Sequence, residues 1–200
     1  MQENIHPIFK NLLSRCDKEK HLHQRAIALW LTGLSCSGKS TIAQHLERLL
    51  YTKGFFSQVL DGDNLRTGIC KNLGFSIYDR IENIRRVAEV SKLFLNSGII
   101  TINTFISPTY QIRSLAKDII GSDDFVEIYI NAPLDVCEKR DVKGLYDKAR
   151  NGLISGFTGI DQTYEVPLMP DIEIRTDELN VEESVDCIYN HILPKITIIN

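Results

Sequence analysis

The sequence predicts an α/β fold in which helices cover both faces of a parallel sheet. Short apolar runs alternate with longer amphipathic runs along the chain, as in strands joined by crossover helices. A glycine-rich segment, GLSCSGKS at 33–40, separates the first apolar run from the first amphipathic run. The 200 residues, of which 43% are hydrophobic and 24% charged, suit one domain that buries its own core.

Five strands and five helices are expected in alternation. The strands are expected at 26–32, 56–61, 99–105, 125–130 and 171–175. The helices are expected at 39–52, 79–96, 110–119, 133–140 and 181–193. Two helix starts have capping-box spacing, Ser76 with Asp79 and Asn180 with Glu183, and Pro108 ends the third strand.

Two segments lack such a pattern. Residues 1–25 are interpreted as a loosely helical lead-in to a single domain over 26–200. Residues from about 141 to 170 have little apolar periodicity, several glycines and a basic start. A long segment without a core face is usually functional, so we predict a mobile lid that closes over phosphates. A solvated surface helix is the alternative interpretation.

Residues 33–40 match the complete phosphate-binding pattern G-x-x-x-x-G-K-[ST], called the P-loop. An apolar run precedes it, and Ile42, Leu46 and Leu50 follow it at helical spacing. Backbone N–H groups of such a loop point inward at a helix N-terminus, which favours a polyanion. Lys39 is expected to reach the β- and γ-phosphates, and the Ser40 hydroxyl is expected to ligate Mg²⁺. The sequence therefore predicts a nucleoside triphosphate site.

Two aspartates follow the second expected strand. If the chain stays extended, Asp61 and Asp63 face the same side, at the strand ends where ligands bind in α/β sheets. One carboxylate would orient Mg²⁺ or its waters, and the other would take a proton from an attacking hydroxyl. Asp-Gly-Asp is also typical of a turn, so the pair favours a kinase only because a P-loop precedes it.

Further candidates lie in segments expected near the same edge. Arg80 and Asn83 are three residues apart on a helix and could grip one anionic acceptor. Ser107 is expected at the end of the third strand, before a proline that disfavours helix. Phe75 and Phe157 lie in glycine-flanked loops, where phenylalanines can stack on adenine or pack inward.

The bulk properties exclude several classes of function. A net charge of −3 argues against general nucleic-acid binding. Five scattered cysteines without C-x-x-C predict reduced thiols rather than a disulfide framework or a zinc site. No secretory signal opens the chain, and no apolar run approaches the roughly 20 residues of a membrane span. We therefore expect a cytoplasmic protein with no membrane partner.

Taken together, these residues resemble the adenylylsulfate kinase family, P-loop enzymes that phosphorylate the 3′-hydroxyl of adenosine 5′-phosphosulfate (adenylyl sulfate). The resemblance covers about residues 27–177. Its blocks are IALWLTGLSCSGKST (27–41), LDGDNLR (60–66), NLGFS (72–76), DRIENIRR (79–86), FISP (105–108), APLDVCEKRD (132–141), KGLYDKAR (143–150) and GFTGIDQTYE (156–165). GFTGID and DRIENIRR are far more discriminating than the P-loop, which many unrelated NTPases share.

The resemblance implies a P-loop kinase-type fold and an activity in sulfate assimilation. ATP with Mg²⁺ would be the phosphoryl donor, and the products would be 3′-phosphoadenylyl sulfate and ADP. It also implies a homodimer, and adenylyl sulfate would come from a separate ATP sulfurylase.

The resemblance further implies a role for each site residue. ATP would be bound by Gly33, Leu34, Ser35, Cys36, Ser37, Gly38, Lys39, Ser40, Thr41 and Arg140. Adenylyl sulfate would be bound by Asp63, Arg66, Phe75, Arg80, Asn83, Ile106, Ser107, Lys143, Gly144, Leu145, Phe157 and Thr158, with its adenine between the two phenylalanines. Ser40 and Asp61 would hold Mg²⁺, and the catalytic residues would be Lys39, Asp63 as the base, and Ser107. The family serine that matches Ser107 has been assigned as a phosphoserine intermediate, but aligned substrates would allow direct in-line transfer.

Three sites depart from the family pattern. Thr109 and Tyr110 stand where tyrosine and arginine are usual, which would weaken acceptor binding unless Arg113 compensates. Val142 stands where proline is usual and would loosen the lid hinge. Cys36 occupies a P-loop position that is usually small, near a helix N-terminus that would acidify its thiol. We hypothesise that oxidation of Cys36 blocks ATP binding; an inert small side chain is the alternative.

Other functions stay open on the sequence alone. A P-loop kinase for another small hydroxyl compound would not need GFTGID or DRIENIRR. A catalytically dead sensor of adenylyl sulfate or its product would be expected to lack an intact P-loop. A non-enzymatic GTP switch would need the N-K-x-D pattern, which is absent. The sequence therefore favours the kinase.

Overall fold

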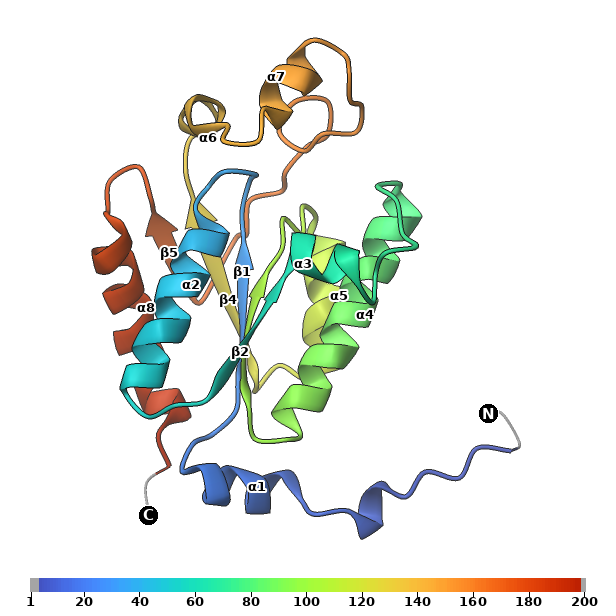
Figure 1. Ribbon diagram of the computed structural model, residues 1–200, viewed down its shortest axis with the longest axis vertical. Coiled ribbons are helices and arrows are strands. Elements are labelled where there is room, and N and C mark those ends of the chain that lie inside the picture. Colours follow the sequence, from blue (N-terminus) through green and yellow to red (C-terminus); the bar gives the residue numbers. More distant parts are fainter. Residues whose placement is uncertain (1–3, 199–200) are drawn as a thin grey trace.

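The computed structural model describes residues 4–198 and contains one five-stranded parallel sheet (Figure 1). Its strands are β1 (Ala28–Thr32), β2 (Ser57–Asp61), β3 (Ile100–Thr104), β4 (Phe125–Asn131) and β5 (Ile172–Arg175). They are ordered β2-β3-β1-β4-β5, so β1 is central and pairs with β3 and β4. All five predicted strands are confirmed, and so is the α/β class.

Helices cover both faces of this sheet. They are α1 (Arg15–Leu22), α2 (Lys39–Thr52), α3 (Gly62–Thr67), α4 (Ile77–Leu95), α5 (Tyr110–Ile120), α6 (Leu134–Arg140), α7 (Leu145–Arg150) and α8 (Val181–Ile196), with a 3-10 turn η1 (Phe9–Asn11). α2 and α8 pack on one face, and α4 and α5 pack on the other (Figure 1). The predicted arrangement, a parallel sheet covered by helices on both faces, is therefore confirmed.

The central strand explains why both cores form. Leu29 and Leu31 of β1 point into the core under α2 and α8, whereas Ala28 and Trp30 point into the core under α4 and α5. Successive side chains of a strand face opposite sides, so an apolar run is needed when both faces are buried. Trp30 is fully buried and stacks near Phe105, with ring centroids 5.5 Å apart.

Several helix boundaries differ from the predicted ones. α4 begins at Ile77 rather than 79, because Ser76 accepts a hydrogen bond from the Asp79 N–H and acts as the N-cap. The Asn180–Glu183 capping box is confirmed, and α8 continues past Pro194 to Ile196. The lead-in contains a real helix, α1, with its own capping box. Arg15 of α1 pairs with Asp124 beside β4, which fixes this helix to the sheet.

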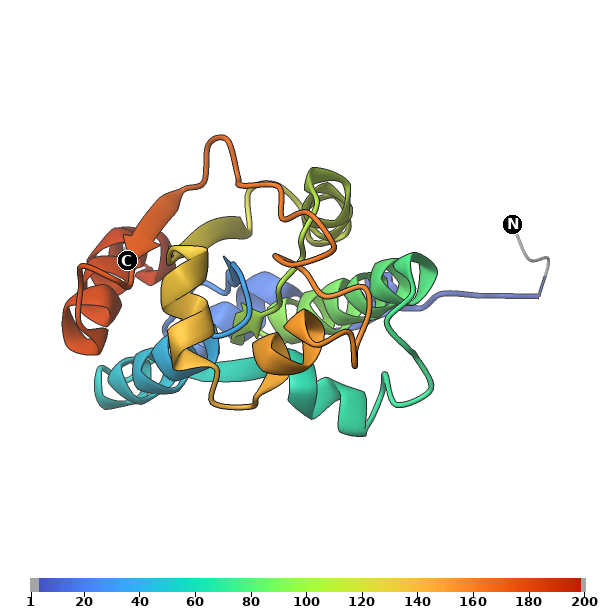
Figure 2. The same cartoon turned by 90° about the horizontal axis from the view of Figure 1, so that it is seen from above.

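The predicted lid segment lies across the carboxyl ends of the strands. α6 leads to it and α7 lies within it, on the same side of the sheet as the P-loop (Figures 1 and 2). Within residues 4–198, no helix combines the length and apolarity that a bilayer crossing requires.

Candidate active site

The P-loop leaves the central strand and enters α2 at the carboxyl edge of the sheet. Gly33 has to be glycine, because a Cβ there would lie 2.3 Å from the Ile130 carbonyl oxygen. Lys39 is the first residue of α2, and its Nζ donates to the carbonyls of Gly33 (3.0 Å) and Leu34 (2.6 Å). The residue is only 9% exposed, and burial lowers the pKa of its ammonium to about 8. Among residues 4–198, this buried ammonium forms no ion pair with a carboxylate.

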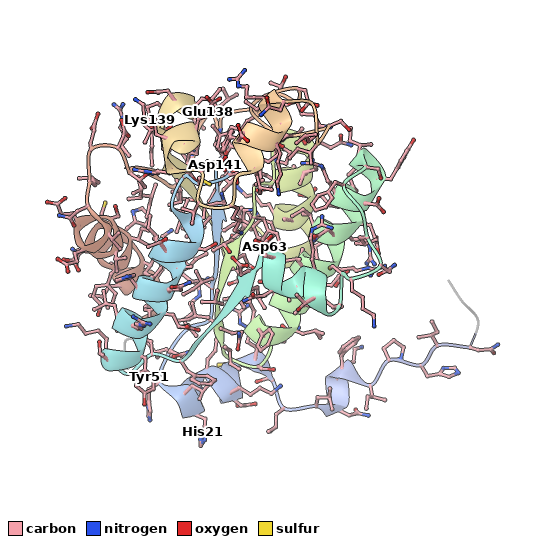
Figure 3. All side chains as sticks on the ribbon, turned by 45° about the horizontal axis from the view of Figure 1, so that its top comes forward. His21, Tyr51, Asp63, Glu138, Lys139 and Asp141 are labelled. Atoms are coloured by element: carbon pink, nitrogen blue, oxygen red, sulfur yellow. The ribbon has the colours of Figure 1, made fainter. Side chains whose placement is uncertain are left out.

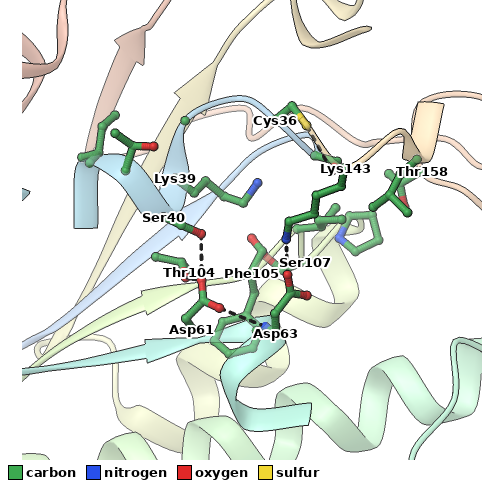
Figure 4. A pocket seen from close by; sticks show the side chains of 18 of the residues that line it. Cys36, Lys39, Ser40, Asp61, Asp63, Thr104, Phe105, Ser107, Lys143 and Thr158 are labelled. Atoms are coloured by element: carbon green, nitrogen blue, oxygen red, sulfur yellow. Dashed lines mark hydrogen bonds and ion pairs between the residues drawn. The ribbon is translucent and has the colours of Figure 1, made fainter. Parts of the chain in front are cut away.

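Ser40 and Asp61 form the second part of the site. Ser40 Oγ donates to Asp61 Oδ2 (2.8 Å), and Thr104 Oγ1 donates to the same oxygen (2.7 Å) (Figure 4). The backbone N–H groups of Asp63 and Asn64 donate to Asp61 Oδ1. Burial raises the pKa of the Asp61 carboxyl, but these four hydrogen bonds outweigh it and hold the pKa below its ordinary value.

This pair fits Mg²⁺ in its chemistry. A carboxylate and a hydroxyl are hard oxygen donors, and Mg²⁺ is usually held by one or two carboxylates together with substrate phosphates. Among residues 4–198, no group of three or more His, Cys, Asp or Glu side chains could hold a metal ion alone. A metal here would therefore depend on the phosphates of a bound nucleotide.

The route by which Asp63 reaches the site differs from the predicted one. The chain does not stay extended after Asp61, because Asp61 caps α3 and Asp63 lies in the first turn of that helix. Asp63 nevertheless faces the cleft, where its carboxylate pairs with the Lys143 ammonium of the lid segment (Figures 3 and 4). The hydrogen bond from Lys143 to Asp63 raises the pKa of Lys143. Both side chains are more than half exposed, so water weakens this pair.

Two arginines and an asparagine line the cleft on the side of α4. Arg80 donates to the Phe75 carbonyl (2.9 Å), the Gly156 carbonyl (2.6 Å) and Thr158 Oγ1 (3.1 Å), so it links α4 to the lid segment. Arg66 lies over the Phe75 ring at 4.3 Å. Asn83 is buried, and its Nδ2 has no hydrogen-bond partner within the described residues. It is a donor that remains available to an oxygen of a ligand.

The two predicted phenylalanines both line this cleft. Phe75 is 66% exposed, whereas Phe157 is half-buried and meets Tyr146 edge-on at 4.9 Å. Of the two phenylalanines, only Phe157 packs partly inward, whereas Phe75 is exposed in the cleft.

The lid segment has a folded nucleus that the sequence analysis did not predict. The Asp141 carboxylate, labelled in Figure 3, accepts hydrogen bonds from the N–H groups of Leu145, Tyr146 and Asp147 and so starts α7. Tyr146 is buried and donates its hydroxyl to the Ser35 carbonyl of the P-loop (2.9 Å). The lid segment is thus in contact with the P-loop in this structure.

Ser107 is fixed from three sides. It has a φ of +36°, which is unusual outside glycine, and is only 3% exposed. Its Oγ accepts from Trp30 Nε1 (3.1 Å) and donates to Thr32 Oγ1 (3.0 Å), and its carbonyl accepts from Arg113 (3.0 Å). Arg113 is itself buried and pairs with Glu127 (2.9 Å). Arg113 does not line the cleft, and its guanidinium is engaged inside the fold, so it does not supply the missing acceptor-site arginine.

One cleft of about 860 Å³ brings nearly all the predicted residues together. Those that line it are Ser35, Cys36, Gly38, Lys39, Ser40, Thr41, Asp61, Asp63, Arg66, Phe75, Arg80, Asn83, Ile106, Ser107, Arg140, Lys143, Leu145, Phe157 and Thr158. Those that do not are Gly33, Leu34, Ser37 and Gly144. Cys36 is half-buried and lines the cleft, which is where the oxidation hypothesis requires it to be.

Sequence reasoning missed part of the lining at the other end of the cleft. Thr176, Leu179, Asn180, Val181 and Ser184 are among the missed residues there, and Thr104 was missed beside Asp61. Thr176 carried a usable signal, because it directly follows the last predicted strand and ligands bind at the carboxyl ends of strands.

A sequence model of the adenylylsulphate kinase family matches residues 25–175. The chain belongs to this family. An adenylyl-sulfate kinase of Bacteroides thetaiotaomicron is 56% identical over 195 residues, which cover 98% of this chain and 97% of the relative.

Two solved kinases of the family share this fold. The Mycobacterium tuberculosis APS kinase CysC, solved in complex with AMPPNP and APS, superposes with a TM-score of 0.82 at 42% identity. That match covers 84% of this chain and 98% of the other. A hexameric APS kinase from Thiobacillus denitrificans superposes with a TM-score of 0.64 at 28% identity, over 86% of this chain and 30% of the other.

Proposed function

We propose that this protein transfers the γ-phosphoryl group of ATP to the 3′-hydroxyl of adenylyl sulfate, giving 3′-phosphoadenylyl sulfate and ADP. The observation that carries the proposal is that the P-loop and an anion-binding region open into one cleft. Lys39 and Ser40 stand on one side, and Arg66, Arg80 and Asn83 stand on the other. Membership of the adenylylsulphate kinase family agrees with this activity.

The donor would bind along the P-loop. The γ-phosphate would take the Lys39 ammonium away from the carbonyls of Gly33 and Leu34, which hold it now. Ser40 and Asp61 would hold Mg²⁺, which when bound supplies positive charge between the phosphates. Cleft closure by the lid segment would keep water away from the reacting phosphate.

The acceptor would bind at the other side. Its adenine would lie between Phe75 and Phe157, and its phosphosulfate would meet Arg66, Arg80 and the free donor of Asn83. Asp63 would accept the proton of the 3′-hydroxyl, and Lys143 would leave Asp63 for an acceptor oxygen. Because Lys143 belongs to the lid segment, its movement from Asp63 to the substrate would link the position of the lid segment to the electrostatic environment of the Asp63 base.

We also propose that the transfer is direct. Ser107 is only 3% exposed and its Oγ donates to Thr32, so a phosphoryl group there would remove that donor hydrogen and would need space that the side chain lacks. Ser107 would support the acceptor site through its backbone. The protein would act as a cytoplasmic homodimer, with adenylyl sulfate supplied by a separate ATP sulfurylase; light scattering of the purified protein tests the dimer.

The test is coupled ADP release with MgATP, with and without adenylyl sulfate. Wild type should release ADP only with the acceptor, and Asp63→Asn should lower kcat by at least ~100-fold, as expected for loss of a general base. Asp186→Asn, on the exposed face of α8, is the matched control and should be unchanged. If calorimetry shows acceptor binding but no ADP is released, the protein is a sensor instead. If the protein neither binds adenylyl sulfate nor releases ADP, the proposal is overturned.

A further inference from the structure

Thr176 connects three parts of the donor side of the cleft. It follows β5 directly, and its N–H donates to the Asn131 carbonyl at the end of β4 (2.9 Å). The backbone of Thr176 is therefore fixed to the sheet. Its side chain lies between the P-loop and Arg140 at the end of α6, and it lines the cleft.

The side-chain hydroxyl of Thr176 is used in both directions. Oγ1 donates to the Ser37 carbonyl in the P-loop (2.8 Å) and accepts from Arg140 Nη1 (3.0 Å). A hydroxyl has one hydrogen and two lone pairs, so one group can make both contacts. The Thr176 carbonyl accepts from Arg140 Nη2 (2.6 Å). Both arms of the guanidinium are thus held by one residue.

Arg140 is well placed to contact a nucleotide. It is the last residue of α6, where the lid segment begins, and it lines the cleft together with Leu179, which precedes α8, and Val181, the first residue of α8. Two hydrogen bonds fix the plane of a guanidinium, because its donors form a rigid fork. A flat cation held in this way offers a face on which the donor base can stack.

We infer that Thr176 is a positioning residue for the donor nucleotide. It sets the plane of the Arg140 guanidinium and joins it to the P-loop backbone at Ser37. Phosphate binding by the loop and nucleotide binding by Arg140 then share one support. The inference rests on the proposed function for the identity of the donor, and it predicts an effect on ATP that does not extend to adenylyl sulfate.

The test removes the hydroxyl and keeps the shape. Thr176→Val retains the methyl group, which lies 3.6 Å from the position of a Cβ at Gly38. We expect the Kd of mant-ATP with Mg²⁺ and the KM of ATP to rise about tenfold, the size of one hydrogen bond to a charged group. The kcat at saturating ATP and the KM of adenylyl sulfate should stay unchanged. Thr176→Ser, which keeps the hydroxyl, should bind as wild type does.

Two further variants separate positioning from a structural role. Thr52→Val removes a hydroxyl that donates to the Leu49 carbonyl outside the cleft, and it should leave the Kd unchanged. Thr176→Val combined with Arg140→Met should weaken mant-ATP binding by less than the sum of the two single losses, because part of the effect of Thr176 passes through Arg140.

Three results would overturn the inference. They are an unchanged Kd in Thr176→Val despite a lower Tm, a failure of Thr176→Ser to restore binding, and additive losses in the double variant. If wild type itself does not bind mant-ATP, the proposed function fails together with this inference. If wild type binds it and Thr176→Val binds equally well, only this inference fails.

Discussion

The burial of Lys39 predicts that ATP binding takes up a proton at alkaline pH. Burial lowers the pKa of this ammonium from its ordinary 10.5 to about 8 in the free protein. A bound triphosphate favours the ammonium form and raises the pKa again. Below pH 8 the Lys39 side chain is charged both with and without ATP, so its titration does not make ATP affinity depend on pH. Above pH 8 the free side chain is neutral, and binding has to add a proton.

The size of the effect follows from this shift. Each pH unit above 8 lowers ATP affinity by up to tenfold, about 1.4 kcal/mol, until the pKa of the bound form is reached. Between pH 7 and pH 9 the total loss is roughly tenfold, and proton uptake rises from nearly zero to about 0.9 per site. The free fold itself gains stability between about pH 8 and 10.5, because the unfolded lysine binds more protons there.

Isothermal titration calorimetry measures this uptake directly. MgATP is titrated at pH 7, 8 and 9, each in two buffers whose ionisation enthalpies differ, and the slope of the observed enthalpy counts protons. ATP phosphates do not interfere, since the second pKa of a phosphate ester is about 6. Lys39→Ala is the control and should bind more weakly with no uptake at pH 9. Uptake near zero in wild type at pH 9 would refute the reasoning.

Other substitutions test packing, capping and stacking. Leu46→Ala, in the fully buried face of α2, should cost about 2–5 kcal/mol of unfolding free energy in urea, whereas Leu93→Ala on the exposed face of α4 should change it by less than about 0.5 kcal/mol. Asn180→Ala removes the N-cap of α8 and should cost about 1 kcal/mol in the same assay; no loss would mean that this cap is dispensable. Phe75→Ala should raise the KM of adenylyl sulfate by about tenfold through lost base stacking. Tyr78 is 82% exposed and lies outside the cleft, so Tyr78→Ala should leave this KM unchanged. Equal effects of the two substitutions would contradict an adenine site at Phe75.

Local patterns predict the sheet and much of the cleft. β1 and β4 are mostly apolar, whereas β3 and β5 alternate apolar with polar residues, and β1 leads directly into a P-loop whose spacing is diagnostic. Since all strands are parallel, their carboxyl ends meet at one edge. Asp61 and Ser107 could therefore be placed near the P-loop without knowledge of the strand order.

Short helices and interior polar contacts escape such patterns. α3 has six residues, too few to show a helical period, and its cap is the strand residue Asp61. α7 buries only Tyr146 and Ala149 and depends on the Asp141 carboxylate for its start. Arg113 looks free in the sequence, but its partner Glu127 lies on another element, so its burial is a property of the tertiary fold. Ionic pairs that form only on folding leave no local periodicity to detect.

The order of the strands has a consequence for synthesis of the chain. The P-loop is complete at residue 40, but β1, which carries it, pairs with β3 and β4, whose residues follow much later. A growing chain therefore carries an unpaired apolar strand until more than half of the protein has emerged, a state prone to aggregation. Arg140 and Thr176 join later still. ATP stabilises only a species that binds it, so ATP stabilises the completed, folded protein and not the nascent chain.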